Sequence, residues 1–501
     1  MTDNLNRDVK VGMLWSILER GGVQFFNLVA TIVLARLLSP KDFGILGLAV
    51  LFTGTSGTVT SLSFGMAIVQ RDEVRQDHLA TILVIQGAIN VCTFLVLFAL
   101  SPWVGAYFGN PLIGKVLEAT SFNFLIRIIG ICPSAMLRRE RVFRPLSIGQ
   151  MLDAFVDLVV AVPLGILGFG VWSLVYGGLA GSLVSKLYLV YASQWKPSLR
   201  VTRQAFNELF SFGMGVSLAG IINDISKRSN SFIVGKWLGT AQLGYFDKAT
   251  SLISVPINDL GKRATSVLFP VFARIRHEPG RFKAAIRRSV LSLSLVSYPI
   301  FASLTVLAPE FIYVMYGRKW APVVPPFQIL AFSGVPLLLL QLMISVTFVT
   351  GRSRHEMGRR TVMAVLLVAG SIVGSRWGIS GIATATAIVN MIGLILVVWQ
   401  VYRLGLLRPL ADVVKPQTIP FTGAIAMIVA EHACQAWAQS IDLSAFISLP
   451  LGLAVGAVVY LGVVAMMRDE VLTRLLIELK GDIEPIADRV PMFGALVRLW
   501  R

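Results

Sequence analysis

The sequence predicts an all-α polytopic membrane protein, and three observations support this fold class. Long apolar stretches fill most of the 501 residues, and 55% of the residues are hydrophobic whereas 14% are charged. An ordinary soluble protein has about 25% charged residues, and an apolar stretch of about 20 residues can cross a bilayer as a helix. Lys and Arg also collect in every second gap between the apolar stretches, and the intervening gaps hold few charges.

Fourteen apolar segments are predicted to be transmembrane helices. Their approximate bounds are 12–36, 43–67, 79–101, 115–137, 147–168, 171–192, 208–235, 242–262, 289–308, 323–350, 360–376, 378–402, 417–438 and 445–467. An even number of spans places both termini on one side of the membrane. The basic gaps, such as the one with Arg138, Arg139 and Arg141, mark that side as cytoplasmic by the positive-inside rule. We therefore predict a multi-pass protein of the bacterial inner membrane with both termini in the cytoplasm.

Composition also excludes several classes of partner. The net charge of +18 is dispersed over loops, whereas nucleic-acid binding needs a contiguous basic face. We expect contact with anionic membrane lipids and no nucleic-acid partner. The three cysteines lie in apolar segments and the four histidines lack metal-ligand spacing, so no disulfide, metal or cofactor is expected. The first apolar stretch is too long for a removable signal peptide.

Two segments two hundred residues apart form an internal repeat. Val33–Gly44 and Ile233–Gly244 each contain the end of an apolar segment, a cation, a tight turn and the start of the next segment. The repeat predicts two pseudo-symmetric six-helix lobes. The expected divisions are 1–200 for the N-terminal lobe, 201–405 for the C-terminal lobe, 406–467 for transmembrane helices 13 and 14, and 468–501 for a cytoplasmic amphipathic tail. That tail either lies on the leaflet or packs on the loops.

The segment Leu34–Gly44, with the sequence LARLLSPKDFG, resembles a motif of the Wzx-type polysaccharide and lipopolysaccharide exporters. These belong to the multidrug/oligosaccharidyl-lipid/polysaccharide (MOP) flippase superfamily, and the resemblance covers roughly residues 7 to 410. It implies a MATE-like V of two lobes around a cavity that opens alternately to each side. It also implies a flippase, not an enzyme, that moves a polyprenyl-diphosphate-linked oligosaccharide for surface or extracellular polysaccharide assembly. The implied partners are that glycan, membrane lipids and polysaccharide polymerase or export machinery.

Charged and amide side chains inside the spans are the candidate site residues, because a charge at the bilayer centre costs about 2.5–3.5 kcal/mol on insertion scales. Arg and Lys suit a diphosphate, and amides can both donate to and accept from sugar hydroxyls. The candidate diphosphate-binding residues are Arg20, Arg127, Lys227 and Arg228. The candidate ion-coupling or cavity carboxylates are Glu19, Asp153, Asp157 and Asp224. The candidate glycan contacts are Gln24, Asn27, Asn223 and Asn230.

The same charges also permit a structural interpretation. Asp224 precedes Lys227 and Arg228 by three and four residues, which is the spacing of an intrahelical ion pair. Glu19 could pair with Arg127, or Asp157 with Lys186, between helices. We further expect Asp247, Lys248 and Asp259, which lie near span ends, to reach the membrane interface. The outer aromatic belt is expected to contain Trp103, Tyr107, Phe108, Trp320 and Trp377. Spans 13 and 14, which we expect to carry almost no charge, are a candidate groove for the prenyl chain by analogy with related lipid-precursor flippases.

Two other functions are compatible with parts of the sequence. A multidrug or cation antiporter of the same superfamily would favour carboxylates and aromatics in its cavity, whereas the charges inside these spans are balanced or basic. A membrane glycan polymerase or ligase would need a large polar outer loop with acid/base groups. The longest predicted outer loops, near 102–114 and 309–322, are short and contain no His. The sequence therefore favours the flippase.

Overall fold

The computed structural model describes residues 2–60, 76–140, 142–195, 228–351 and 353–467. Every regular element within these ranges is a helix, which confirms the predicted all-α class. The predicted tail over 468–501 and most of the seventh predicted span lie outside the described residues. The chain divides into two compact units. Unit 1 comprises Met1–Lys248, Met315–Val323 and Leu367–Ile382, and unit 2 comprises Ala249–Val314, Val324–Leu366 and Ala383–Arg501.

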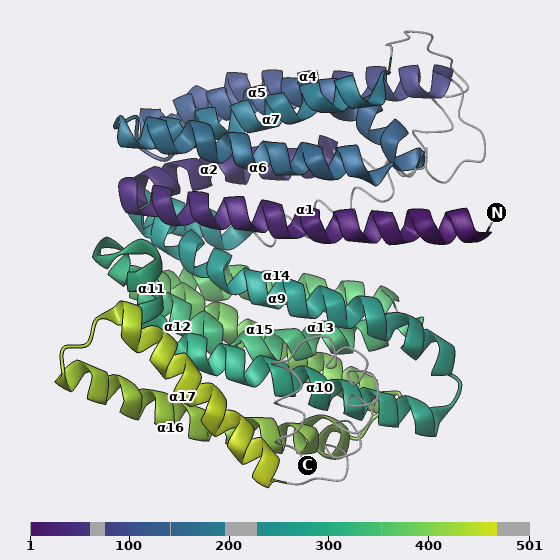
Figure 1. The fold of residues 1–501 in the computed structure, drawn as a ribbon, viewed down its shortest axis with the longest axis vertical. Coiled ribbons are helices and arrows are strands. Elements are labelled where there is room, and N and C mark those ends of the chain that lie inside the picture. Colours follow the sequence, from purple (N-terminus) through teal and green to yellow (C-terminus); the bar gives the residue numbers. More distant parts are fainter. Residues whose placement is uncertain (1, 61–75, 141, 196–227, 352, 468–501) are drawn as a thin grey trace. The chain divides into compact units, whose positions relative to one another are not determined.

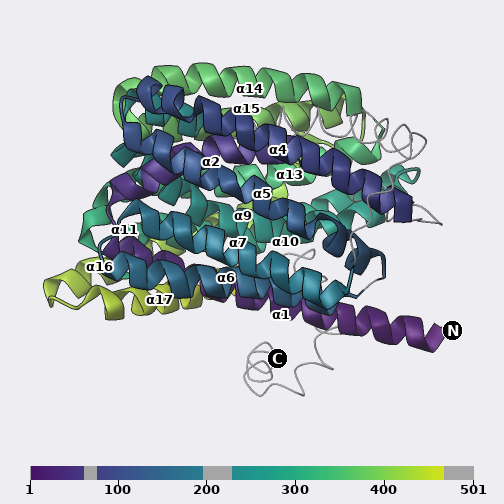
Figure 2. The ribbon, with the colours of Figure 1, turned by 90° about the horizontal axis from the view of Figure 1, so that it is seen from above.

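Unit 1 is a layered bundle of long helices. Its complete helices are α1 (Thr2–Leu37), α2 (Pro40–Thr60), α4 (Gln76–Tyr107), α5 (Pro111–Arg139), α6 (Phe143–Ile166) and α7 (Val171–Ser193). Helix α6 packs against α1 and α7, and α5 packs against α2, α4 and α7. Figures 1 and 2 both show α6 lying between α1 and α7, with α4 beside α5.

Unit 2 is arranged around α10. The helices that lie wholly within it are α10 (Pro279–Val306), α12 (Val324–Phe332), α13 (Gly334–Val349), the short helices η3 (Pro409–Val414) and η4 (Lys415–Gln417), α16 (Thr418–Ser440) and α17 (Ala445–Met466). Helix α10 packs against α12, α13, α16 and α17, and α16 packs against α17.

Several elements either contain a boundary between the two units or lie in the two parts of unit 1 that come from the second half of the chain. They are α9 (Thr240–Ile275), α11 (Ala308–Tyr316), η1 (Arg318–Val323), α14 (Ser353–Gly374), η2 (Ser375–Trp377) and α15 (Gly378–Arg403). The chain thus returns to unit 1 twice from its second half, at Met315–Val323 and at Leu367–Ile382.

Many of these helices are suited to a membrane. Eight helical segments in the described part of the chain are long and apolar enough to cross one, and nine are if Arg318–Phe332 and Gly334–Val349, which meet at 41°, form a single span. The protein is therefore a polytopic membrane protein. The predicted spans apart from the seventh each overlap a helix, but spans 11 and 12 fall within one continuous apolar segment, Gly358–Arg403. The count of fourteen stays a prediction.

A capping box sets the turn between α1 and α2. The Ser39 backbone N–H donates to Asp42 Oδ2 at 3.0 Å, and the Asp42 N–H donates to Ser39 Oγ at 3.3 Å. The Ser39 hydroxyl also donates to Asp42 Oδ2 at 2.6 Å. Pro40 occupies the first helical position, where its missing N–H costs nothing. The Ser-Pro-Lys-Asp sequence therefore ends one helix and immediately starts the next.

The second copy of the repeat adopts the same local structure. A helix ends near Trp237, and α9 begins at Thr240, just as α1 ends at Leu37 and α2 begins at Pro40. In this copy Gly239 has a positive φ of 87°, a conformation that glycine adopts without steric cost. The predicted repeat of local structure is thus confirmed, whereas the division of the whole chain into two lobes stays a prediction.

The two copies contact each other through two glycines within unit 1. A Cβ on Gly44 would overlap the Thr240 carbonyl oxygen, and a Cβ on Gly244 would overlap the Pro40 carbonyl oxygen. The contact is reciprocal, as expected for two related turns packed about a pseudo-two-fold axis. Because the neighbouring atoms belong to backbone, they cannot move aside as a flexible side chain can.

Substituting Gly44 by alanine is expected to destabilise the protein by about 1–3 kcal/mol, since the methyl group would separate the first turns of α2 and α9. Gly178 on α7 is the matched control, because a Cβ there meets no atom within 4 Å. Thermal unfolding of the detergent-purified variants measures the difference. An unfolding temperature for Gly44→Ala equal to that for Gly178→Ala would contradict the close contact.

Candidate functional site

Four of the predicted intramembrane charges come together in unit 1 on α5, α6 and α7. Asp153 and Asp157 are four residues apart and therefore share a face of α6. This face packs on the glycines of α7: a Cβ on Gly181 would lie 2.8 Å from Asp153 Oδ1, and one on Gly177 would overlap Asp157 Oδ1. Small residues on α7 thus make room for both carboxylates.

The cations of this cluster approach from the neighbouring helices. Lys186 on α7 extends along Gly130 of α5, whose missing Cβ leaves space for the lysine stem. It attracts Asp153 and is repelled by Arg127, and Asp153 and Asp157 repel each other. Arg127 has its guanidinium carbon 5.6 Å from the centre of the Phe124 ring. We call these four charged residues, Arg127, Asp153, Asp157 and Lys186, the α5–α7 cluster.

The α5–α7 cluster brings together residues that the sequence singled out, but with different pairing. Lys186 interacts with Asp153, whereas the structural interpretation of the sequence paired it with Asp157. Arg127 contacts an aromatic ring and no carboxylate within the described residues. The cluster therefore holds one favourable pair, a second carboxylate, and an arginine that has no ion-pair partner in the described part of the chain.

Helix α1 carries four more of the predicted residues. Ser147 Oγ on α6 donates to Glu19 Oε2 at 2.6 Å, so the partner of Glu19 is this hydroxyl and not Arg127. Arg20, Gln24 and Asn27 are exposed. Their side chains are available to a ligand in the conformation described.

Five candidates belong to the seventh predicted span, and only two of them lie within the described residues. Asn223, Asp224 and Lys227 lie outside the described residues. Arg228 donates from Nη1 to the Val50 carbonyl at 3.2 Å. Asn230 is buried, and its Oδ1 accepts a hydrogen bond from Ser371 Oγ at 2.7 Å.

Asp247 and Lys248 have partners within unit 1, and their reach to the membrane interface stays a prediction. Ser231 Oγ donates to Asp247 Oδ1 at 2.9 Å. Lys248 Nζ lies 4.0 Å from the centre of the Phe43 ring and 5.5 Å from that of Tyr316. Cation–π contacts of this kind stabilise a desolvated ammonium by about 2 kcal/mol. The position in the sequence suggested a helix end, but the aromatic partners lie far away in the chain.

The C-terminal end of α1 is capped by a distant segment of unit 1. Lys319 Nζ donates to the carbonyls of Arg36, at 2.8 Å, and Leu38, at 2.6 Å, and Trp320 Nε1 donates to the Ala35 carbonyl at 2.8 Å. The last carbonyls of a helix lack intrahelical partners and favour a nearby cation. Trp320 is fully buried, so its predicted place in an outer aromatic belt was wrong.

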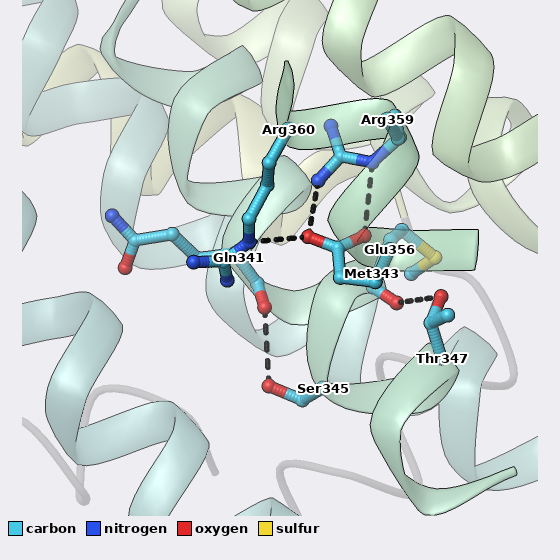
Figure 3. A network of polar contacts seen from close by, with 7 residues as sticks. All are labelled: Gln341, Met343, Ser345, Thr347, Glu356, Arg359 and Arg360. Atoms are coloured by element: carbon cyan, nitrogen blue, oxygen red, sulfur yellow. Dashed lines mark hydrogen bonds and ion pairs between the residues drawn. The ribbon is translucent and has the colours of Figure 1, made fainter. Parts of the chain in front are cut away.

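A second charge network lies in unit 2, at the start of α14 (Figure 3). Glu356 is buried and accepts hydrogen bonds from Arg359, at 2.9 and 2.6 Å, and from Arg360, at 2.8 Å. Arg359 is almost completely buried, whereas half of the Arg360 side chain is exposed. The sequence analysis counted these arginines among the charges of the basic gaps and did not single them out. The spacing of three and four residues from Glu356 was the signal that could have revealed the network.

Unit 2 also contains a buried carboxyl that the sequence analysis missed. Glu431 lies on α16 and is fully buried, and Ser303 Oγ on α10 donates to its Oε1 at 2.6 Å. The prediction of almost no charge in spans 13 and 14 allows for this one acidic side chain, which the sequence analysis did not single out. Within the described ranges no three His, Cys, Asp or Glu side chains lie together as metal ligands would.

Comparison with known proteins identifies the family. A profile of the family described as "Polysaccharide biosynthesis protein" matches residues 33–325, which is more than half of the chain. The chain belongs to this family. The match begins at the repeat segment that contains Leu34–Gly44, and it confirms the predicted relationship to the Wzx-type exporters.

Two relatives of similar length align with almost the whole chain. The sequence is 23% identical to the teichuronic acid biosynthesis protein TuaB of Bacillus subtilis (strain 168), over 94% of this chain and 98% of TuaB. It is 26% identical to the succinoglycan biosynthesis transport protein ExoT of Rhizobium meliloti (strain 1021), over 95% of this chain and 97% of ExoT.

The fold is also similar to that of a solved structure. The lipid II flippase MurJ, in an inward closed conformation, superimposes with a TM-score of 0.71 at 14% sequence identity, covering 91% of this chain and 98% of MurJ. At this identity the likeness shows a shared fold. The two proteins therefore have the same polytopic helical fold.

Exchanging the two charges of the favourable pair tests the α5–α7 cluster. Asp153→Lys and Lys186→Asp are each expected to destabilise the protein, because each places two like charges together inside the bundle. The double variant should recover about 0.5–3 kcal/mol, the usual size of coupling between contacting residues. Thermal unfolding of all three variants measures the recovery, and strictly additive losses would show that the two charges do not interact.

Proposed function

We propose that the protein is a flippase that moves a polyprenyl-diphosphate-linked oligosaccharide across the bacterial inner membrane for surface or extracellular polysaccharide assembly. The observation that carries this proposal is the mixed-charge cluster among α5, α6 and α7. It occurs in a chain that is similar along almost its whole length to polysaccharide biosynthesis and transport proteins. The shared fold with a lipid II flippase supports the same class of substrate.

The α5–α7 cluster supports a division of roles. Asp153 neutralises Lys186, which keeps the interior stable when no substrate is bound. Arg127, which has no carboxylate partner in the described part of the chain, is the residue proposed to bind the diphosphate. A guanidinium binds phosphate oxygens in a bidentate manner. Arg20, Lys227 and Arg228 are proposed as further cationic contacts, and Gln24, Asn27, Asn223 and Asn230 as contacts to the glycan.

The remaining carboxylates are proposed to balance the cavity. Glu19, Asp157 and Asp224 would offset the cations between transport cycles or take part in ion coupling. The inside-negative membrane potential assists outward movement of an anionic diphosphate by about 2.3 kcal/mol per charge per 100 mV. A multidrug or cation antiporter would instead favour carboxylates in excess over cations, and the α5–α7 cluster has equal numbers of each.

The proposed membrane arrangement follows the charge pattern of the loops. Fourteen transmembrane helices in two six-helix lobes, divided near residues 200 and 405, would place both termini in the cytoplasm. Alternate opening of the cavity between the lobes would expose the substrate to each side in turn. Polysaccharide polymerase or export machinery would receive the glycan at the outer surface.

Depletion of the protein in its native cell tests the function directly. Lipid-linked glycan is expected to accumulate on the cytoplasmic leaflet, because synthesis continues while translocation stops. The amount of glycan accessible from each side of inner-membrane vesicles, before and after depletion, measures this. Unchanged distribution after complete depletion would refute the flippase function.

Arg127→Gln is expected to reduce transport about tenfold or more at an unchanged unfolding temperature, since a charge-assisted hydrogen bond contributes about 1.5–3 kcal/mol. Arg127→Lys should retain part of the activity because it keeps the charge. Arg287→Gln, at an exposed position on α10, is the control. Export rates, corrected for the amount of folded protein, give the comparison. Full activity of Arg127→Gln would remove this residue from the binding site.

A further inference from the structure

The carboxyl group of Glu431 is enclosed by three helices of unit 2. It lies near the middle of α16, receives the hydrogen bond from Ser303 of α10, and is covered by Gly456 of α17. A Cβ on Gly456 would lie 2.9 Å from Glu431 Cδ. Oε2 is buried and has no hydrogen-bond partner among the described residues. Oε1 thus accepts a hydrogen bond, whereas Oε2 has none within the described residues.

Glu431 lies in the seam between α10, α16 and α17, and the neighbouring ionisable groups of this seam offer no positive charge. Gln435, one turn further along α16, donates from Nε2 to Glu310 Oε2 of α11 at 2.6 Å and to the Val306 carbonyl at 3.2 Å. Glu310 is therefore a second carboxylate next to the seam. His432, the next residue of α16, is exposed.

The packing helices add phenols, and their only ammonium and guanidinium groups within the described residues lie in the first part of α10, at positions 281–288. Tyr460 of α17 donates to the Leu295 carbonyl at 2.9 Å, and Tyr298 of α10 donates to Gln417 Oε1 at 3.1 Å. No Lys or Arg occurs in α11, α12, α13, α17 or residues 289–306. The first cation before Glu431 on the same chain segment is Lys415, about 24 Å away along a helix with a rise of 1.5 Å per residue.

An ionised carboxylate at such a position is costly. Burial of an isolated carboxylate in an apolar interior is so unfavourable that the group normally takes up a proton. A serine hydroxyl cannot supply the missing positive charge. The neutral carboxylic acid is the form compatible with these surroundings.

We propose that Glu431 is a proton-binding residue, neutral in the conformation described, which exchanges its proton during transport. When α16 and α17 shift against α10 and water reaches the seam, the proton leaves Oε2 for water and a hydrated carboxylate remains. Repacking of the three helices requires the carboxyl group to take up a proton again. Only the coupling to transport rests on the proposed function; the protonation itself does not.

Infrared spectroscopy of the purified full-length protein tests the protonation. The carbonyl stretch of a protonated carboxyl group, identified by its shift in D₂O, is expected in the wild type at neutral pH and should be lost in Glu431→Gln. Glutamine matches the shape of the neutral acid, so this variant should fold with little loss of stability. Glu278→Gln is the control, because Glu278 is exposed and pairs with Arg281. If Glu431→Gln retained every carboxyl band of the wild type, the proposal would be overturned.

Transport by reconstituted vesicles tests the coupling. A labelled polyprenyl-diphosphate oligosaccharide is expected to move faster when a pH gradient is imposed on wild-type vesicles, and this response should be absent in Glu431→Gln but present in Glu278→Gln. A response of Glu431→Gln equal to that of the wild type, or a wild-type response to Na⁺ alone, would overturn the coupling. Absence of any wild-type transport would refute the flippase function, while the infrared result would still decide the protonation.

Discussion

The cost of leaving polar groups unpaired in an apolar environment governs this structure. Where α1 ends, its last carbonyls accept hydrogen bonds from Lys319 and Trp320, which lie almost three hundred residues later in the chain. Where carboxylates enter the α6–α7 contact, glycines provide room and Lys186 provides charge. Where Glu356 is buried, two arginines bind it. Five buried side-chain atoms of the described residues have no hydrogen-bond partner, and Oε2 of Glu431 is the one among them that belongs to a carboxyl group. A bound proton explains how this oxygen can be buried.

Local patterns made the helices predictable, because apolar length and turn chemistry are properties of short segments. Ser39-Pro40-Lys41-Asp42 specifies a helix boundary by itself, and the repeat located its counterpart at Gly239-Thr240. The candidate residues Arg127, Asp153 and Asp157 were also found from sequence, since charges stand out in apolar segments. Their clustering was not, because it depends on which faces of α5, α6 and α7 meet.

The errors have the same origin. Trp320 was assigned to the outer aromatic belt, yet it is buried and its partner comes from α1. The aromatic partners of Lys248, which come from α2 and α11, were not predicted either. Glu431 also lies inside a predicted span, but the sequence did not show that its carboxyl group is enclosed by α10, α16 and α17. Whether a charge binds substrate, pairs with another charge or carries a proton depends on contacts between distant segments. Sequence spacing reveals these contacts only when they lie within one helix, as for Glu356, Arg359 and Arg360.

The most direct measurement is translocation by the purified protein in vesicles of defined lipid. A polyprenyl-diphosphate oligosaccharide with a fluorophore on the glycan is incorporated in both leaflets, and a membrane-impermeant quencher is then added outside. With the protein present, fluorescence should fall beyond the fraction that is initially exposed, because inner-leaflet molecules reach the outer leaflet. Quenching that stops at the level of protein-free vesicles would contradict the assignment of this chain as a flippase.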